Sequence, residues 1–417
     1  MASSAQQLNR WLTELGRISD EPGQLTRTFL SPAMKRANAR VSVWMREAGL
    51  TVRVDSVGNL IGRWEAAAPV RRGGSRRPAR PKTLLLGSHL DTVRNAGRFD
   101  GPLGVLLPIA AVAALRRRGV ELPFHVEVLG FSEEEGVRFA SGYLGSLGYS
   151  GRLREADLAL RDDAGVTVRQ ALEAFHGGPF QLPPAAHPRR DLLGYVEVHI
   201  EQGPVLEERK LAVGVVSAIA GQSRFKLTWT GQAGHAGTTP MALRRDALAG
   251  VAEFAVAVEA LARRTPGLVA TIGSMTVSPG ASNVIPGRVL HTLDVRHASD
   301  AVRKKALLAL GRAAAKTARA RQLTCRWQRT QHDGAVNCSP TLTAQLEKSV
   351  RAVQGQSRSL VSGAGHDAVV MAKLAPVAML FVRCRAGLSH HPDEFASPGD
   401  IEVALRVLVD FLQALDG

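Results

Sequence analysis

Hydrophobic positions along the chain follow two alternating patterns, short apolar runs typical of buried strands and longer stretches with the spacing of helices. Two runs, residues 83–88 (TLLLGS) and 124–131 (FHVEVLGF), flank a helix pattern over residues 102–118 that Gly119 closes. The alternation returns near the C-terminus as a helix, a strand and a helix, expected at residues 364–374, 377–382 and 400–415. Strands that alternate with helices predict an α/β fold.

Residues 213–329 interrupt this alternation with a different order of elements. The pattern predicts a strand, a helix, two strands and a helix, at residues 224–230, 243–263, 268–277, 288–296 and 301–321. Such a run is typical of a small α+β domain with an antiparallel sheet. We therefore expect two domains, one formed by residues 1–212 and 330–417 and the other by residues 213–329. The length of 417 residues, more than one hydrophobic core usually serves, agrees with this division.

The composition has a strong excess of positive charge, with 53 Lys and Arg against 37 Asp and Glu and a formal net charge of +16. This excess favours an acidic partner, and a nucleic-acid-binding protein is one alternative that it raises. Six basic residues lie among Pro and Gly at residues 69–82, but without interleaved aromatic side chains this stretch is typical of a solvated loop. The other basic residues are dispersed and no known nucleic-acid-binding signature is visible, so we expect no nucleic-acid partner.

Cysteine usage and hydropathy indicate the cellular setting. Cys325, Cys338 and Cys384 form no CxxC pair and are odd in number, which argues against a disulfide framework and for a reducing, cytoplasmic setting. The first residues, MASSAQQLNRWLTEL, do not have the order of a signal peptide, and no apolar run reaches the roughly 18 residues of a spanning helix. We expect a cytoplasmic protein without a membrane partner.

Polar residues that could carry chemistry follow the predicted strands, where open α/β sheets place their ligands. They are His89 and Asp91, Asp100, Glu133 to Glu135, His199 with Glu201 and Gln202, and His390 with His391. Any one of them has an ordinary explanation as a structural histidine, a helix cap or a solvated turn. Together, histidines and carboxylates are the ligands that divalent zinc, manganese or cobalt prefers. Acidic residues at this density would repel one another unless a cation offset their charge.

Two metal ions account for this set better than one. A bridging carboxylate such as Asp100 can hold two ions about 3.5–4 Å apart, with a water between them whose pKa falls towards about 7. Such a site also needs a second glutamate as general base, to accept the proton of the water and pass it to the leaving nitrogen. The adjacent Glu134 and Glu135 supply one ligand and one base. The pattern predicts metal-assisted hydrolysis.

Seven motifs resemble those of the M20-type metallohydrolases, and specifically their carbamoylase branch. In chain order they are SHLDTV, FDGPLGV, EEEGVRF, HIEQGP, GQAGHAGTTPM, SGAGHDA and GLSHHPDEF, and the resemblance covers residues 55–393. This branch comprises N-carbamoyl-L-amino acid hydrolase, allantoate amidohydrolase and β-ureidopropionase, and HIEQGP and GHAGTTPM are specific to it. The opening stretch RISDEPGQLTRTFLSPA leans towards the allantoate-type members.

The resemblance implies a mixed-sheet catalytic domain with an inserted ferredoxin-like lid and dimerisation domain, a homodimer, and two divalent ions per subunit. It implies five metal ligands, which are His89, Asp100, Glu135, His199 and His390. Asp100 would bridge the two ions, which zinc, manganese, cobalt or nickel would suit. His391 is an alternative to His390, because relatives have Ser or Asn at that second position.

Roles in catalysis and substrate binding also follow from the resemblance. Glu134 would be the general base, Asp91 would orient His89, and Glu133 would be a solvated neighbour. In relatives the histidine of GHAGTTPM, here His235, reaches the active site of the partner subunit and stabilises the oxyanion. Substrate contacts are implied for Gln222, Asn283, Arg296, Gly365 and His366. Arg296 is suited to a bidentate grip on a carboxylate, and His366 has a structural role as its alternative.

We therefore expect an amidohydrolase that cleaves the ureido carbon–nitrogen bond of a small anionic N-carbamoyl acid, with release of ammonia and carbon dioxide. Allantoate and N-carbamoyl-L-amino acids are both open as substrates. An aminoacylase or dipeptidase that hydrolyses an amide with the same metals is the alternative, against which HIEQGP argues. The positive charge of the chain favours the approach of such an anion.

Overall fold

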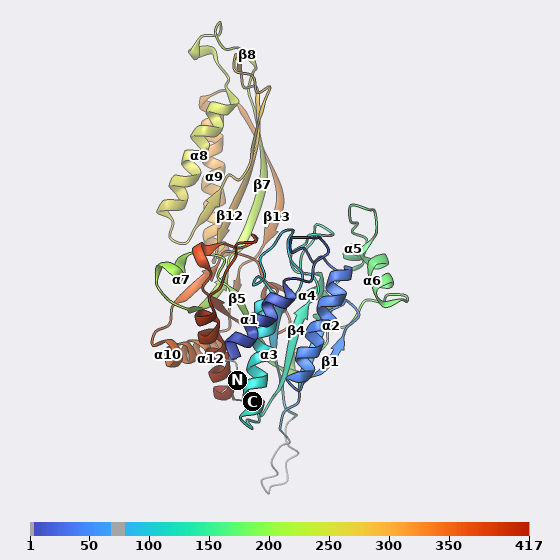
Figure 1. Cartoon of the computed structure of the whole chain (residues 1–417). Coiled ribbons are helices and arrows are strands. Elements are labelled where there is room, and N and C mark those ends of the chain that lie inside the picture. Colours follow the sequence, from blue (N-terminus) through green and yellow to red (C-terminus); the bar gives the residue numbers. More distant parts are fainter. Residues whose placement is uncertain (1–3, 68–79, 417) are drawn as a thin grey trace. The chain divides into compact units, whose positions relative to one another are not determined.

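The computed structural model describes residues 4–67 and 80–416 (Figure 1). Most of the basic stretch at residues 69–82, predicted to be a solvated loop, lies outside the described residues. The chain divides into two compact units, a first unit of residues 1–217 and 338–417 and a second unit of residues 218–337. Among the helices of the described residues, none combines the length and the hydropathy that crossing a membrane requires.

A mixed sheet forms the centre of the first unit, with the strand order β1-β2-β4-β3-β5-β16-β6 and with β15 beside β6. The strands are β1 (Thr51–Val54), β2 (Leu60–Trp64), β3 (Thr83–His89), β4 (His125–Phe131), β5 (Leu192–Ile200), β6 (Val213–Ile219), β15 (Ser359–Ser362) and β16 (Val377–Val382). The four central strands β4, β3, β5 and β16 run parallel, whereas β2 and β6 pair with them in the antiparallel sense. The α/β class predicted from the sequence is confirmed.

Helices cover this sheet and close its core. They are α1 (Ser4–Leu15), α2 (Pro32–Glu47), α3 (Pro102–Arg117), α4 (Leu144–Tyr149), α5 (Glu155–Leu158), α6 (Val168–His176), α7 (Val205–Glu208), α10 (Pro340–Gln354), α11 (Ala368–Met371) and α12 (Pro398–Ala414). Buried side chains of α1, α2, α3, α10 and α12 form one hydrophobic cluster with the sheet. Three of these helices, α2, α10 and α12, begin with a Ser-Pro pair in which the serine hydroxyl accepts a backbone N–H of the first turn.

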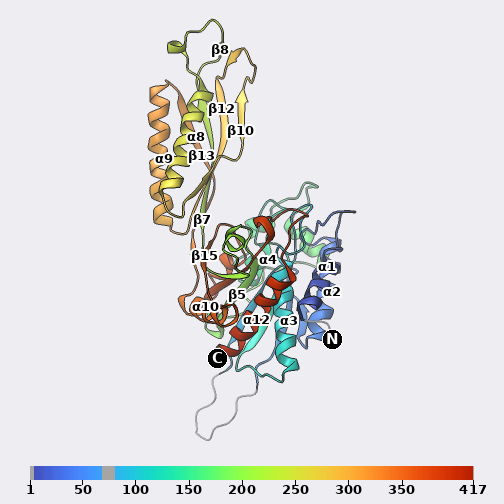
Figure 2. The ribbon, with the colours of Figure 1, turned by 60° about the vertical axis from the view of Figure 1, so that its left-hand side comes forward.

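The second unit is an antiparallel sheet with two helices on one face (Figure 2). Its elements are β7 (Gly221–Thr230), β8 (Gly234–His235), α8 (Ala247–Arg264), β9 (Val269–Thr271), β10 (Met275–Ser278), β11 (Val284–Ile285), β12 (Arg288–His297), α9 (Asp300–Ala320), β13 (Thr324–Asp333) and β14 (Val336–Asn337). The strand order β10-β12-β7-β13, with β9 also on β12, is the 4-1-3-2 order of ferredoxin-like sheets. Trp229, Phe254 and Leu310 lie in the core between sheet and helices.

The structure differs from the sequence prediction in three places: the bounds of the insert, one strand and one helix. The insert was expected over residues 213–329, whereas the second unit spans residues 218–337, because β6 begins by pairing with β16 and β13 runs on to Asp333. The single strand expected over residues 268–277 is divided into β9 and β10, which pair with different parts of β12. The helix expected over residues 364–374 is reduced to α11 and turns.

Candidate active site

The candidate site lies at the carboxyl ends of the four parallel strands. His89 ends β3 and His199 stands next to the end of its neighbour β5. Glu134 and Glu135 follow β4, and His390 follows β16 on the other side of β5. Because parallel strands all end at the same edge of a sheet, these side chains, which are far apart in the sequence, meet there.

Asp100 joins this group from the start of α3. The N-cap residue of α3 is Gly101, with φ 79° and no side-chain cap hydrogen bond, so the Asp100 carboxylate does not serve as a helix cap. A Cβ atom at Gly101 would lie 2.4 Å from Cε1 of His89. Glycine is therefore required here twice, for its left-handed backbone and for the close approach of α3 to the imidazole.

We expect Gly101→Ala to lower the free energy of unfolding by more than Gly177→Ala. Gly177 also has a positive φ of 73°, but a Cβ there would meet no atom within 4 Å, so that variant carries only the backbone cost of about 1–2 kcal/mol. Only the change at Gly101 also displaces His89 and weakens metal binding. Urea unfolding and metal titration of both variants measure the two effects, and equal losses in both would contradict the role of Gly101.

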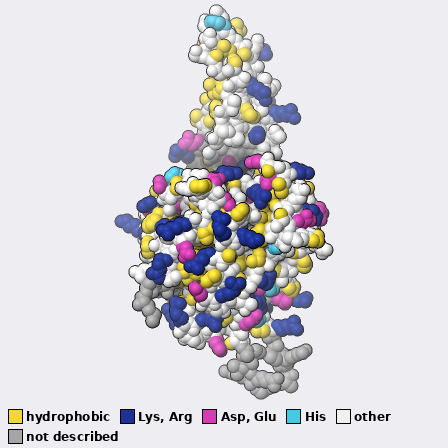
Figure 3. Space-filling model, turned by 45° about the vertical axis from the view of Figure 1, so that its right-hand side comes forward, with side chains coloured by type: hydrophobic (Ala, Val, Ile, Leu, Met, Phe, Trp, Pro, Cys, Tyr) yellow, Lys and Arg dark blue, Asp and Glu magenta, His cyan; other side chains and the backbone are white. Residues whose placement is uncertain are grey.

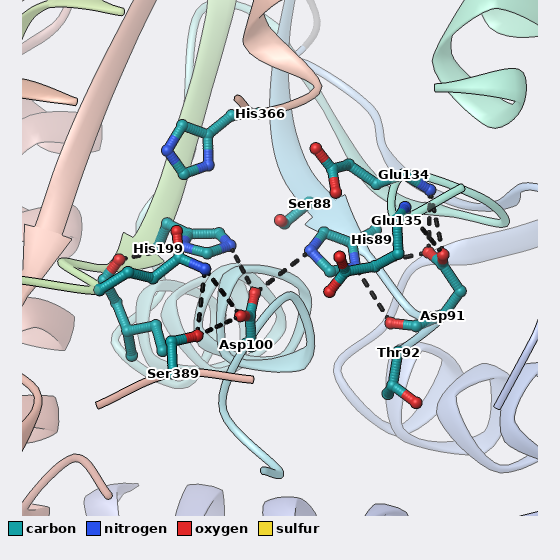
Figure 4. A network of polar contacts seen from close by, with 12 residues as sticks. Ser88, His89, Asp91, Thr92, Asp100, Glu134, Glu135, His199, His366 and Ser389 are labelled. Atoms are coloured by element: carbon teal, nitrogen blue, oxygen red, sulfur yellow. Dashed lines mark hydrogen bonds and ion pairs between the residues drawn. The ribbon is translucent and has the colours of Figure 1, made fainter. Parts of the chain in front are cut away.

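Asp100 is shared between two groups of candidate ligands. Figure 4 shows its contacts with His89 and His199. Its Oδ1 atom lies 3.1 Å from Nε2 of His199 and 3.5 Å from Nε2 of His89. Its Oδ2 atom lies 3.4 Å from Nε2 of His390, and that Nε2 lies 3.6 Å from Oε1 of Glu135. The two oxygens of one carboxylate thus face two different ligand groups, which is the arrangement of a bridging ligand.

The two buried histidines have a defined tautomer. Nδ1 of His89 lies 3.0 Å from the carbonyl oxygen of Asp91, and Nδ1 of His199 lies 2.9 Å from that of Ile200. Because a carbonyl oxygen only accepts, each Nδ1 carries a proton and donates it. The neutral form of each ring, which is the form that binds a metal ion, therefore has its lone pair on Nε2, the atom that faces Asp100.

Charges in the site are balanced against one another. Burial would lower the pKa of His89, but hydrogen bonds to Asp100 and Asp91 raise it well above its ordinary value. Burial raises the pKa of Asp100, yet His199 and the other histidines lower it well below the ordinary value. Burial, with Asp100 as the next cause, raises the pKa of Glu135 to about 7. A divalent cation among these groups would stabilise the charged carboxylates, so the donor set fits a metal centre.

Asp91 contacts His89 and the turn that carries Glu134 and Glu135. Its carboxylate lies 3.4 Å from Nδ1 of His89, farther than its own carbonyl oxygen. The same carboxylate accepts the backbone N–H of Glu134, at 3.0 and 3.1 Å, and that of Glu135, at 3.1 Å. Asp91 therefore holds the turn that carries the two glutamates. The side chain of Glu134 lies in the ligand group formed with His89 and Glu135, and burial raises its pKa well above the ordinary value.

Neighbouring residues of the same motifs have other roles. Glu133 was expected to be solvated and is fully buried, because its Oε1 accepts the backbone N–H of Gly136 inside the turn. Glu201 accepts the N–H groups of Val205 and Leu206 and so caps α7. His391 is exposed and faces Asp393, whereas His390 is the member of the pair that lies with Asp100 and Glu135.

His366 and Gly365 belong to the first unit and lie near the ligands. The ring of His366 is buried, stands edge-on to that of His199 with centroids 4.5 Å apart, and its Nε2 lies 2.8 Å from Oγ of Ser362. Burial lowers the pKa of His366 well below its ordinary value, so the ring is neutral. At Gly365 a Cβ would lie 2.0 Å from the hydroxyl of Tyr143, a residue that sequence reasoning did not single out.

The other predicted substrate residues lie in the second unit, in two separate pairs. Gln222 and Arg296 are register partners on β7 and β12, and Arg296 forms a two-pronged ion pair with Asp294. His235 lies on β8, which pairs with β11, and its neighbour Ala236 donates to the carbonyl oxygen of Asn283. The first pair stands at one end of β7, and the second lies beyond the other end.

Sequence reasoning missed several residues that support the ligands. Arg27 is fully buried, and its guanidinium donates to the carbonyl oxygens of Leu90, Leu15 and Ile18 beneath the loop of His89. Ser389 and Glu394 contact Asp100 from the loop after β16. Ser389 and Glu394 flank a predicted ligand within one motif, and this proximity is the only signal that could have identified them.

The strand ends of a mixed sheet bring together two groups of His and carboxylate side chains that share Asp100, and these residues form a candidate metal centre of a hydrolase. The model of peptidase family M20/M25/M40 matches residues 85–414. The chain belongs to this family, and the resemblance predicted from the motifs is confirmed.

Relatives and solved structures cover nearly the whole chain. A probable allantoate deiminase of Oryza sativa subsp. japonica is 40% identical over 96% of this chain and 86% of its own length. An N-carbamoyl-L-amino-acid amidohydrolase of Pseudomonas sp. (strain NS671) is 40% identical over 96% of this chain and 94% of its own. The crystal structure of an amidase of the hydantoinase/carbamoylase family from Burkholderia multivorans has a TM-score of 0.90 and 34% identity, and covers 98% of this chain and 97% of that one.

Proposed function

We propose that this protein is a metal-dependent amidohydrolase that cleaves the ureido carbon–nitrogen bond of a small N-carbamoyl acid, either allantoate or an N-carbamoyl-L-amino acid. The observation that carries the proposal is the sharing of Asp100 between two ligand groups with Glu134 beside them. The names of relatives with 40% identity over nearly the full chain support the ureido substrate class.

In this mechanism the ligand residues would hold two divalent ions, and zinc, manganese, cobalt or nickel would supply Lewis acidity and lower the pKa of water. His89 and His199, as neutral rings, would offer Nε2 to one position, and Glu135 and His390 would offer their side chains to the other. Glu134 accepts the proton of the attacking water and passes it to the leaving nitrogen. The surroundings of Glu134 support this role, because burial raises the pKa of its carboxyl well above the ordinary value and so makes the carboxylate a stronger base.

His235 is suited to stabilise the oxyanion. Its Nδ1 accepts the backbone N–H groups of Gly237 and Thr238, at 3.0 and 3.2 Å. A neutral ring in this arrangement carries its proton on Nε2, which is a donor for a developing negative oxygen. Arg296 and Gln222, register partners on β12 and β7, are suited to bind the substrate carboxylate, and Asn283, Gly365 and His366 are further substrate residues that the family resemblance implies.

The separation of the two pairs in the second unit supports a homodimer. The nine residues of extended strand from Gln222 to Thr230 span about 26 Å, and His235 lies beyond that end. One substrate cannot contact Arg296 and His235 of the same unit across that distance, whereas His235 of a second copy can approach it. Met241 and Leu243, 77% and 72% exposed near His235, supply apolar surface for such a contact.

The distribution of charge fits a small anionic substrate. Figure 3 shows Lys and Arg side chains scattered over the visible face among Asp, Glu and apolar side chains, without one continuous basic surface. Such a surface favours the approach of a small anion more than the binding of nucleic acid.

A substrate panel tests the proposed function. Protein stripped by a chelator and reloaded with manganese or zinc is incubated with allantoate, N-carbamoyl-L-amino acids, N-acetyl amino acids and dipeptides, and ammonia and free amine are measured. Release of ammonia from a ureido acid supports the proposal. If only the N-acetyl amino acids or dipeptides are hydrolysed, the protein is an aminoacylase or dipeptidase and the proposed ureido substrate class is wrong.

We expect His235→Gln to lower kcat about 10²–10³-fold with a small change in KM, because the lost donor acts on the transition state. Mixing it with a Glu134→Gln chain should restore activity, to about a quarter of wild type for random pairing. In such a heterodimer, one site combines an intact Glu134 with an intact His235 of the partner. His176→Gln, at an exposed histidine of α6, is the control, and no recovery on mixing would contradict the contribution in trans.

A further inference from the structure

Asp100 receives hydrogen bonds on only one of its two oxygens from residues that are not candidate ligands. Oγ of Ser389 lies 2.5 Å from Oδ2, and Nε2 of Gln202 donates to the same oxygen at 2.8 Å (Figure 4). The contacts of Oδ1 are the Nε2 atoms of His199 and His89. Neither Ser389 nor Gln202 has a part in the hydrolysis proposed above.

The protons of the Gln202 amide and the Ser389 hydroxyl can be assigned to their acceptors. Nε2 of Gln202 also lies 3.1 Å from Oγ of Ser389, so its two protons serve Asp100 and Ser389. Ser389 has one proton and two carboxylate neighbours, Asp100 at 2.5 Å and Glu394 at 3.2 Å. The hydroxyl proton of Ser389 therefore points to Asp100, the nearer of the two carboxylates. Oδ2 of Asp100 therefore accepts from both Gln202 and Ser389.

Glu394 holds the backbone of Asp100 in place. Its Oε1 accepts the N–H groups of Phe99 and Asp100, at 2.8 and 3.0 Å, and the side chain is buried. A Cβ atom at Gly97 would lie 2.3 Å from Cβ of Glu394, so glycine there admits the carboxylate. The backbone of Asp100 is held by one residue and its side chain by two others.

Two of the residues around Oδ2 of Asp100 have an energetically unfavourable backbone conformation. Gln202 has φ 55° and His390 has φ 56°, in the left-handed region that non-glycine residues seldom adopt. Such strain persists where surrounding contacts determine the conformation. Here it directs the Gln202 amide and the His390 ring onto one oxygen, from loops that follow β5 and β16.

We propose that Ser389, Gln202 and Glu394 are positioning residues that orient Asp100 as the bridging ligand, and that they act most strongly on the metal position formed with Glu135 and His390. The proposal rests on the metal-dependent function proposed above. Oδ2 serves that position, and its two donors stop the carboxylate from rotating away. Oδ1 faces two buried imidazoles that hold their own orientation through backbone carbonyls.

Cobalt titration of the metal-free protein tests this assignment, with the d–d absorption bands and a competing chelator giving the affinity of each position. We expect Ser389→Ala to lower the affinity for Co²⁺ at the Glu135–His390 position about 10–100-fold, which is the usual effect when a ligand loses its hydrogen-bond partner. The affinity at the His89–His199 position should fall less. Ser389→Thr, which keeps the hydroxyl, should restore the affinity. Gln202→Met and Gly97→Ala, which removes room for Glu394, should act in the same direction.

Ser397→Ala is the matched control. Ser397 also donates to a carboxylate, that of Asp400 at 2.7 Å, but it caps α12 and touches no candidate ligand. It should lower Tm without changing either Co²⁺ affinity. If Ser389→Ala lowers Tm with both affinities unchanged, its role is structural and the proposal is overturned. Wild-type protein that binds fewer than two Co²⁺ overturns it together with the metal mechanism, whereas two bound Co²⁺ without ureido turnover refutes only the substrate class.

Discussion

Glu134→Gln is expected to reduce kcat about 10²–10⁴-fold while metal content and KM change little. The amide keeps the size of the side chain but cannot accept the proton of the attacking water, so the loss falls on proton transfer. Glu134 lies half-buried beside His89 and Glu135, and burial raises its pKa well above the ordinary value. Ammonia release at saturating substrate, with metal analysis of the same sample, measures both quantities.

Glu133→Gln is the matched control for this prediction. Glu133 is the preceding residue and is fully buried, but its carboxylate binds the N–H of Gly136 within the turn. We expect that variant to lose less than tenfold in kcat. A Glu134 variant with wild-type kcat, or one that has lost its metal, would show that the proton acceptor lies elsewhere or that Glu134 is a ligand.

Asp100→Asn is expected to remove activity altogether, together with tight binding of both ions. The amide has one oxygen and no charge, so it cannot serve the His89–His199 group and the Glu135–His390 group together. Metal content after dialysis should fall from the two ions per subunit proposed above to fewer than one, and kcat to the background of the assay.

Asp400→Asn separates this effect from a general loss of stability. Asp400 and Asp100 are both 5% exposed, but Asp400 pairs with Arg383 at the start of α12. Breaking that ion pair should lower Tm and leave metal content at its wild-type value. Two retained ions in Asp100→Asn would contradict the bridging assignment.

The sheet and the positions of the polar residues on it were predictable because each depends on local pattern. Short apolar runs such as residues 83–88 and 377–382 predict buried parallel strands, and residues directly after them reach one edge. The helix expected over residues 364–374 was wrong in extent, because Oγ of Ser362 bonds to Ala364 and His366 and holds those residues in a turn. Side-chain bonds of this kind leave no periodic signal.

The finer features of the site depend on which way single side chains point, which a linear pattern does not contain. His390 and His391 are adjacent and chemically identical, and only the left-handed backbone of His390 directs one of them to Asp100. Glu133 was misjudged for the same reason, since three consecutive glutamates do not show which one turns inward. Ser389 and Gln202 were invisible as partners of Asp100, because they come from loops after different strands.

The ligands come from five separate segments of the first unit, from β3 to the loop after β16, and this dispersion has a thermodynamic consequence. No unfolded or half-folded chain can present them together, so ions bind the folded state and stabilise it by mass action, with about 1.4 kcal/mol for each tenfold rise of free metal above Kd. Metal supply would therefore add to the free energy of unfolding of the first unit. A chelator would lower that free energy as well as stop turnover, and protease resistance would follow metal availability.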